Sequence, residues 1–251
     1  MLDLDLLMDL HVDGERQGPG SEAETLQALK LTGVDQNAPL QIADLGCGTG
    51  ASTLVLAQAL QNAQITAVDF LPPFLEKLQT RARERGVAEQ ITTLACSMEE
   101  LPFAAGTYDL IWSEGAIYNM GFEKGVCELK RFLKPGGKLA VSEISWLSSS
   151  RPTEIQEFWE QNYAEMATPA GKLKVLEKHG YAPEGFFVLP ADCWLENYYG
   201  PLQKRYDAFL ARHNFSDAAQ ALVESDKAEV DLYQRFQKFY GYGFYIASRC
   251  P

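Results

Sequence analysis

The sequence has few histidines, no closely spaced cysteine pair and no long hydrophobic run. Its 251 residues include 3 histidines and 5 cysteines, and no two cysteines form a C-x-x-C pair. We therefore expect no metal site and a reducing, cytoplasmic setting. No apolar run approaches the roughly 20 residues that a membrane-spanning helix needs, and the acidic start MLDLDLLMDL is unlike a signal peptide. We expect no membrane segment.

Positive charge is also scarce. Lysine and arginine together number 22 against 34 aspartates and glutamates, which gives a formal net charge of -12. Proteins that bind nucleic acids normally present a basic surface, because neutralising phosphates supplies most of the affinity. The composition therefore predicts no nucleic-acid partner, and the negative field suits a small molecule, including a cationic one.

Short apolar runs alternate with helical patterns in the first part of the chain. Strand-like runs lie at 40–45, 64–70, 91–95, 108–113 and 138–145. One helical face is formed by Phe74, Leu75, Leu78 and Ala82, and a second by Phe122, Val126, Leu129 and Leu133. We expect KPGG at 134–137 to end the second helix. Strands that alternate with helices predict an α/β fold with a doubly wound, mainly parallel sheet.

The pattern changes after residue 146. A helix is expected from near Pro152 to Met166, and another that contains Leu173 and Leu176 and stops at Gly180. Strands are expected at 184–190 and 242–248, with helical patterns at 202–210 and 233–240 between them. We see no repeat and no linker, and therefore expect a single domain over residues 1–251 with a helical insertion near the C-terminus.

The stretch IADLGCGTG (42–50) places three glycines directly after the first strand. Ligands of open α/β sheets bind at the carboxyl ends of the strands, so Gly46, Gly48 and Gly50 mark a close approach of a ligand to the backbone. The letters also satisfy the permissive G-x-G-x-x-G/A pattern of dinucleotide sites. No lysine follows the glycines, as a phosphate loop for nucleoside triphosphates requires.

Two carboxylates discriminate between the remaining ligands. Asp44 precedes the glycines, and a fixed negative charge there disfavours a pyrophosphate on the following helix but favours an ammonium or a sulfonium. Asp69 ends the second strand, where a carboxylate can accept both hydroxyls of a ribose. The pair therefore indicates S-adenosylmethionine, a nucleoside with a sulfonium and no phosphate.

The chain at this point resembles a known family. D-L-G-C-G-T-G (44–50), V-D-F (68–70), S-M-E-E-L-P-F (97–103), Y-D-L-I-W-S (108–113) and L-K-P-G-G-K-L (133–139) are similar to the successive motifs of class I S-adenosylmethionine-dependent methyltransferases. The resemblance covers roughly residues 16 to 145. R-Q-G-P-G-S (16–21) and S-E-G-A-I-Y-N-M-G-F (113–122) are similar to a subgroup that acts on small molecules.

The resemblance implies a fold, a cofactor and a division of the chain. The fold would be a Rossmann-like, seven-stranded sheet whose last strand is antiparallel, and the cofactor would be S-adenosyl-L-methionine. Residues 1–37 would form an N-terminal helical segment, 38–145 the cofactor-binding core, and 146–251 the substrate-side helices and the last two strands. The reaction would be N- or O-methylation of a small-molecule acceptor by in-line displacement.

Cofactor contacts follow from the motifs, residue by residue. The Gly46–Gly50 loop, with Cys47, would face the methionine part, and Asp44 would lie near its amino group. Asp69 would hold the ribose and Phe70 would lie against the adenosine. The remaining contacts implied are Ser97 and Met98 at the adenine, Ser113 and Glu114 at the methionyl end, and Arg16 and Gln17 at the carboxylate. An alternative for the last pair is a plain loop before the helix that Ser21 begins.

Methyl transfer needs a nucleophile held in line with the methyl group and a group that accepts its proton. Our catalytic candidates are Glu114, Tyr118 and Glu143, which follow or end the fourth and fifth strands; an isolated His11 is a weaker one. Glu114 could instead only orient the cofactor, and Tyr118 could only pack. His179 and His213 lie at helix ends, where we expect them to complement the helix dipole.

Several aromatic residues fall outside or at the edge of the helical and strand patterns. If they share a cavity with Glu114 or Glu143, they suit an amine or aromatic acceptor through cation–π contact or stacking. The predicted substrate-binding residues are Tyr118, Trp146, Trp194, Tyr198 and Tyr199; packing in the core is the alternative. Two other functions stay open, an NAD-dependent oxidoreductase and a non-catalytic cofactor-binding protein of the same fold.

Overall fold

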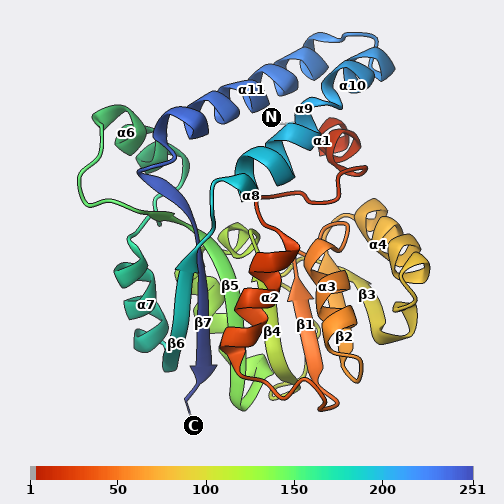
Figure 1. The fold of residues 1–251 in the computed structure, drawn as a ribbon, viewed down its shortest axis with the longest axis vertical. Helices are drawn as coiled ribbons and strands as arrows, with labels where there is room; N and C mark the ends of the chain where they lie inside the picture. Colours follow the sequence, from red (N-terminus) through yellow and green to blue (C-terminus); the bar gives the residue numbers. More distant parts are fainter. Residues whose placement is uncertain (1–3, 251) are drawn as a thin grey trace.

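A sheet of seven strands forms the centre of the structure, a computed structural model that describes residues 4–250 (Figure 1). The strand order is β3-β2-β1-β4-β5-β7-β6. Strand β7 runs antiparallel to both its neighbours and the other pairs are parallel, which confirms the predicted doubly wound sheet with an antiparallel last strand. The strands are β1 (Gln41–Leu45), β2 (Gln64–Asp69), β3 (Ile91–Ala95), β4 (Tyr108–Glu114), β5 (Leu133–Trp146), β6 (Tyr181–Val188) and β7 (Tyr240–Arg249).

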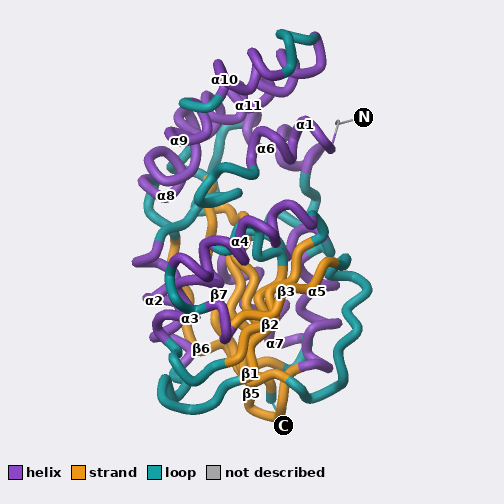
Figure 2. Tube along the Cα trace, turned by 90° about the vertical axis from the view of Figure 1, so that its right-hand side faces the viewer, coloured by secondary structure: helices purple, strands orange, loops and turns teal. Residues whose placement is uncertain are grey.

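Helices cover both faces of the sheet (Figure 2). On one face α2 (Glu22–Thr32), α3 (Ala51–Ala59) and α4 (Pro72–Glu84) pack on strand residues such as Ile42 and Leu110. On the other face, α5 (Phe122–Leu129) and α7 (Pro169–Lys178) pack on the next residues of the same strands, Ala43 of β1 and Ile111 of β4. The central strands are thus buried on both faces, which explains their continuous apolar runs. Single 3₁₀ turns lie at Ala88–Gln90, Ile117–Asn119 and Lys130–Phe132.

A further layer of helices, here called the helical cap, lies beyond the carboxyl end of β5 (Figure 1). It consists of α1 (Leu4–His11) and the elements between β6 and β7, namely α8 (Asp192–Trp194), a π-helical turn (Leu195–Tyr199), α9 (Gly200–Gln203), α10 (Tyr206–Arg212) and α11 (Asp217–Phe236). Leu6 and Leu10 of α1 pack against Phe209 and Val223 in one apolar cluster. Helix α6 (Thr153–Asn162) follows β5. Within residues 4–250 no helix combines the length and apolarity needed to cross a membrane.

The structure corrects several expected boundaries. KPGG does not end an element: β5 already starts at Leu133, and the pairing shifts from Tyr108↔Leu133 to Leu110↔Lys138. The extra residues form a bulge, in which Gly136 adopts a left-handed φ of +75°. The helix expected to reach Met166 ends at Asn162, the pattern at 202–210 is divided between α9 and α10, and Tyr240 begins β7.

Substitution of alanine at two glycines, Gly50 and Gly136, compares the free-energy cost of a left-handed backbone with the cost of overpacking. Gly50 has φ +91°, and a Cβ there would lie 2.2 Å from Cδ1 of the buried Leu78, whereas a Cβ on Gly136 would meet nothing within 4 Å. We expect Gly136→Ala to lower the free energy of unfolding by about 1 kcal/mol through its left-handed φ alone. Gly50→Ala should add roughly 1–3 kcal/mol of overpacking to a similar backbone cost.

Urea denaturation of both variants without added ligand measures the difference. Equal losses in the two variants would show that Leu78 moves aside freely and that the loop is not tightly packed.

Candidate cofactor and acceptor site

Two adjoining pockets lie at the carboxyl ends of β1, β2 and β4. The larger has a volume of about 380 Å³ and includes Asp69, Phe70 and Met98; the smaller, of about 70 Å³, includes Arg16 and Glu114. Both are lined by Gln17, Gly46, Gly48 and Gly115. The structure thus brings together most of the residues predicted to bind the cofactor, since Ser97 and Tyr118 also line the larger pocket and Cys47 the smaller.

The glycine loop that separates the pockets is tightly packed. Gly46 and Gly48 adopt left-handed φ values of +70° and +55°. A Cβ on Gly46 would lie 2.3 Å from the Cβ of Ala116, and one on Gly48 would lie 2.4 Å from Oε1 of Gln17. The amide N–H groups of Gly46 and Cys47 both donate to the carbonyl oxygen of Val68, at 2.8 and 2.9 Å. The third glycine, Gly50, lines neither pocket and packs on Leu78.

Asp44 lies beneath this loop and is fully buried. Its Oδ2 accepts hydrogen bonds from Ser52 Oγ (2.8 Å) and Thr53 Oγ1 (2.6 Å), while Oδ1 has no hydrogen-bond partner. Desolvation, only partly offset by these bonds, raises the pKa of Asp44 to about 7. The expectation of a fixed charge therefore needs correction, because without a nearby cation the carboxyl is partly protonated at neutral pH.

Asp69 ends β2 at the wall of the larger pocket. Its two oxygens accept the amide N–H groups of Gly48 (2.8 Å) and Leu71 (3.0 Å), which fixes the carboxylate against the loop. Burial raises its pKa. Phe70, which follows, is 65% exposed and lines the same pocket. Ser97 and Met98 border the pocket beyond β3.

Glu114 ends β4, and both oxygens of its carboxylate accept hydrogen bonds. Arg16 Nη1 lies 3.0 Å from Oε2, and Thr25 Oγ1 and Trp112 Nε1 donate to Oε1 at 2.6 and 3.0 Å. Both carboxylate oxygens of Glu114 are therefore engaged within the protein, an arrangement compatible with the orienting role that was the alternative to catalysis. Ser113 is also engaged: it is buried and donates to Leu45 O at 2.9 Å.

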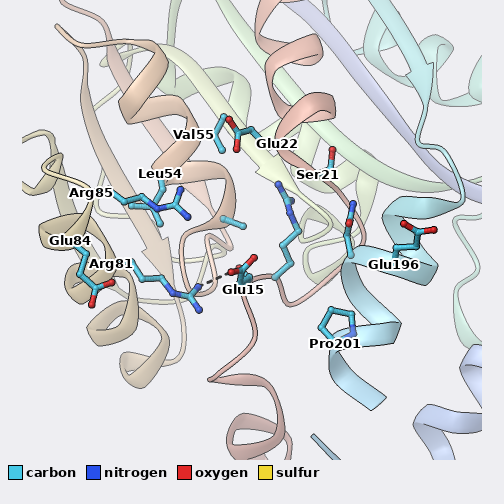
Figure 3. A pocket seen from close by; sticks show the side chains of 13 residues that line it. Glu15, Ser21, Glu22, Leu54, Val55, Arg81, Glu84, Arg85, Glu196 and Pro201 are labelled. Atoms are coloured by element: carbon cyan, nitrogen blue, oxygen red, sulfur yellow. Dashed lines mark hydrogen bonds between the residues drawn. The ribbon is translucent and has the colours of Figure 1, made fainter. Parts of the chain in front are cut away.

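Arg81 of α4 fastens the segment before α2 to the glycine loop. Its Nη1 donates to Thr49 Oγ1 (2.6 Å) and Glu15 O (3.3 Å), and its Nη2 donates to Gly14 O (3.0 Å). Gln17 Oε1 accepts the Thr49 amide at 2.9 Å. Figure 3 shows Arg81 directed toward Glu15 at the wall of a third pocket, of about 440 Å³, which arginines and glutamates line together. No local pattern predicts this role of Arg81, because its partners are distant in the chain.

Glu143 of β5 forms a buried ion pair that was not predicted. Lys172 Nζ of α7 lies 3.2 Å from Oε1 of Glu143, donates to Glu165 O at 2.8 Å, and lies 4.3 Å from the centre of the Phe122 ring. Oε2 of Glu143 has no well-formed hydrogen bond, but the nearby hydroxyl of Tyr163 lowers the pKa of the carboxyl. Desolvation outweighs the attraction of Lys172 and raises the pKa of Glu143.

The predicted aromatic contacts divide into two groups. Trp146, Trp194 and Tyr199 are at most 4% exposed and pack in the core, where Trp194 stacks on Tyr233 with ring centres 4.3 Å apart. We correct their expected role from acceptor contact to packing, because neighbouring side chains cover them. Tyr118, by contrast, is 45% exposed and lines the larger pocket, and Tyr198 keeps part of its surface exposed.

The three histidines are not equivalent. His179 and His213 directly follow α7 and α10, as expected, and pair with Glu123 (2.9 Å) and Asp9 (2.8 Å). His11 is buried at the end of α1. Desolvation, together with the charge of Arg205, lowers the pKa of His11 to about 4, so its ring is neutral at pH 7. Within the described chain, no group of three or more potential ligands is placed to hold a metal ion.

Comparisons with known proteins agree with this geometry. Residues 42–137 match the methyltransferase domain family. The demethylmenaquinone methyltransferase of Thermus thermophilus is 35% identical over 110 residues, 43% of this chain and 49% of that protein. The uncharacterized methyltransferase YodH of Bacillus subtilis is 27% identical over 180 residues, 71% of this chain and 75% of that protein. The crystal structure of an S-adenosylmethionine-dependent methyltransferase from Geobacter sulfurreducens in complex with S-adenosyl-L-homocysteine has a TM-score of 0.84 at 18% identity, and covers 98% of this chain and 99% of that one.

The fold defined by the sheet order and by these structural neighbours is that of the Rossmann-like methyltransferases. Together with the match of residues 42–137 to the methyltransferase domain family, it supports the resemblance to class I S-adenosylmethionine-dependent methyltransferases found in the motifs. The Geobacter sulfurreducens structure and a second neighbour, the S-adenosylmethionine-dependent methyltransferase of Thiobacillus denitrificans (18% identical, TM-score 0.82), were each solved in complex with S-adenosyl-L-homocysteine. The chain spans about half the length of the demethylmenaquinone methyltransferases that it matches.

Asp44→Asn tests the protonation of the buried carboxyl. Because folding raises the pKa of Asp44 from 3.8 to about 7, its contribution to stability is most favourable below pH 4 and is lost as the pH rises toward 7. Asparagine has no such dependence. From pH 5 to pH 8 we expect the ligand-free variant to gain about 2–3 kcal/mol in unfolding free energy relative to wild type.

Urea denaturation of both proteins at the two pH values measures this gain. A stability difference that stays constant with pH would mean that Asp44 is ionised throughout.

Proposed function

We propose that this chain transfers the methyl group of S-adenosyl-L-methionine to a nitrogen or oxygen atom of a small-molecule acceptor in the cytoplasm. The cofactor supplies an activated methyl group: the acceptor's lone pair forms the new bond to carbon, the carbon–sulfur bond breaks, and its electron pair stays on sulfur in S-adenosylhomocysteine. The observation that carries the proposal is the pair of adjoining pockets, with Asp69 on one wall and the orphan oxygen of Asp44 below the loop between them.

The nucleoside part of the cofactor fits the larger pocket. Asp69 would accept the ribose hydroxyls, and the exposed ring of Phe70 would cover the adenosine. Ser97 and Met98 would border the adenine, the latter through its backbone. These assignments agree with the volume of about 380 Å³ and with the mainly apolar surroundings that a flat base requires.

The methionine part of the cofactor fits the smaller pocket. Its ammonium group would approach Oδ1 of Asp44, whose missing partner is the strongest local sign of a cation site. Arg16 would face the carboxylate, held in place by Glu114, and Gln17 would keep the segment closed over the loop. Gly46, Cys47 and Gly48 would contact this part directly, whereas Ser113 and Gly50 would only shape the walls.

On the acceptor side, we assign the uptake of the proton to Glu143, a buried carboxyl of β5. Lys172 fixes its Oε1, and its Oε2 has no well-formed hydrogen bond. Tyr118 borders the larger pocket and would position the acceptor. The unpaired Oδ1 of Asp44 beneath the glycine loop favours the ammonium group of methionine there over the pyrophosphate of NAD.

Ligand binding tests the cofactor assignment. Isothermal titration should give heat with S-adenosylhomocysteine and none with NAD. Loss of the ribose contacts in Asp69→Ala should raise the Kd of S-adenosylhomocysteine by roughly 10-fold or more, as expected for hydrogen bonds to a charged group of about 1.5–3 kcal/mol. The matched control is Glu100→Gln, an exposed acid that follows the neighbouring strand β3. Tight binding of NAD in this pocket would contradict the proposal.

Glu143→Gln tests the proton acceptor. The amide can still accept a hydrogen bond from Lys172 but cannot take up a proton, so kcat should fall by about 10²–10⁴-fold while the Kd of S-adenosylhomocysteine stays within a factor of two. Because burial raises the pKa of Glu143, wild-type activity should rise with pH at values above the usual carboxylate range. Release of S-adenosylhomocysteine measures both, and Glu165→Gln serves as control. An unchanged kcat would exclude Glu143 as the base.

A further inference from the structure

The segment that connects α1 to α2, residues 12–21, forms neither helix nor strand. Within the described chain, the amide groups from Glu15 to Gly18 form no hydrogen bond with another main-chain group. Side-chain contacts must therefore fix the conformation of this segment. Its conformation matters because residues 16–19 and the glycine loop both line the smaller pocket. The shape of that pocket depends on how closely the segment is held to the loop.

The guanidinium group of Arg81 forms hydrogen bonds to the segment and to the loop at the same time. On the loop, its Nη1 donates to Oγ1 and to the carbonyl oxygen of Thr49, at 2.6 and 3.2 Å. On the segment, Nη1 donates to Glu15 O at 3.3 Å and Nη2 donates to Gly14 O at 3.0 Å (Figure 3). Arg81 lines neither the larger nor the smaller pocket, so it can influence a ligand there only through the residues that it holds.

These bonds bring together main-chain oxygens from two parts of the chain. Carbonyl oxygens accept hydrogen bonds and cannot donate them, so those of Gly14, Glu15 and Thr49 cannot bond to one another. The cation between them supplies the donors that allow them to lie close together. Thr49 continues the connection, because its amide donates to Oε1 of Gln17 at 2.9 Å and its hydroxyl donates to Gly14 O at 3.0 Å.

A second contact between α4 and the segment is weaker. Nζ of Lys77 lies 2.8 Å from Oδ1 of Asp13, but the Asp13 side chain is 61% exposed. Exposed ion pairs of this kind contribute little to stability. Arg81 is half-buried, and its planar guanidinium binds several acceptors at once. Arg81 is therefore the main connection between α4 and the segment.

We propose that Arg81 is a positioning residue for the cofactor. By holding the segment against the glycine loop, it keeps Arg16 and Gln17 where they meet the methionine part of S-adenosylmethionine. Arg81 thus sets the affinity for the cofactor without contacting it. This inference rests on the proposed function, which assigns the methionine part to the smaller pocket.

Isothermal titration of S-adenosylhomocysteine into variants of α4 tests the inference. Arg81→Ala should raise the Kd roughly 10-fold or more, as expected when hydrogen bonds to a charged group are lost. Arg81→Lys should raise it about threefold or more, because an ammonium group does not reproduce the planar fork. Arg83→Ala is the matched control: it removes the same charge from an exposed position of the same helix and should leave the Kd within a factor of two. Urea denaturation at the temperature of the titration identifies any variant that is partly unfolded.

A double-mutant cycle tests whether the effect passes through the segment. In a protein that already carries Arg16→Ala and Gln17→Ala, Arg81 has no cofactor contact left to hold in place. Adding Arg81→Ala to that protein should therefore change the Kd by less than about twofold. The same fold increase in both backgrounds would overturn the inference, as would an unchanged Kd in Arg81→Ala accompanied only by a loss of stability. Failure of the wild type to bind S-adenosylhomocysteine would instead overturn the proposed function.

Discussion

The carboxylate of Glu114 joins the parts of the chain that enclose the site. It ends β4 and receives hydrogen bonds from Arg16 of the N-terminal segment, Thr25 of α2 and Trp112 of its own strand. Its side chain is only 9% exposed, so these bonds act in a medium of low dielectric constant and are stronger than they would be in water. Without Glu114, the guanidinium of Arg16 would be left nearly buried with no countercharge, and the segment that carries Gln17 to the glycine loop would lose its anchor.

The same region contains several carboxyl groups whose burial opposes folding. Asp44 lies under the glycine loop, Glu143 lies beside Lys172, and Asp226 and Glu229 lie on one face of α11. Burial raises the pKa of each of them. A chain selected for stability alone would place apolar side chains at such positions. For Asp44, whose Oδ1 has no hydrogen-bond partner, a ligand that brings positive charge to the glycine loop would offset this cost.

Features that depend only on residues close together in the sequence could be predicted from it. The glycine loop, the acidic ends of β1 and β2 and the order of strands and helices are local patterns, and the pockets formed where these patterns placed them. The bulge at KPGG was not predicted, because only the shifted pairing with β4 shows that the chain continues as a strand. Trp194 was misjudged because the rings that cover it, such as Tyr233, come from distant segments.

The contacts that complete the site could not be predicted for the same reason. Arg81 reaches Gly14 and Lys172 reaches Glu143 across long stretches of chain, and nothing in the local sequence distinguishes either from a surface residue. Asp226 and Glu229 have the spacing of an ordinary solvent-exposed helix face. Only the structure shows that one oxygen of Asp226 is buried and that Glu229 accepts a hydrogen bond from Tyr199.

The position of β7 between β5 and β6 has a consequence for biosynthesis. Both neighbours leave the ribosome before β7 does, yet they cannot pair with each other in the finished sheet. Until residues 240–249 emerge, each exposes an unpaired edge that can bind another nascent chain. Productive folding of this half of the molecule must therefore wait for the last strand, and premature termination upstream of it would yield an aggregation-prone product.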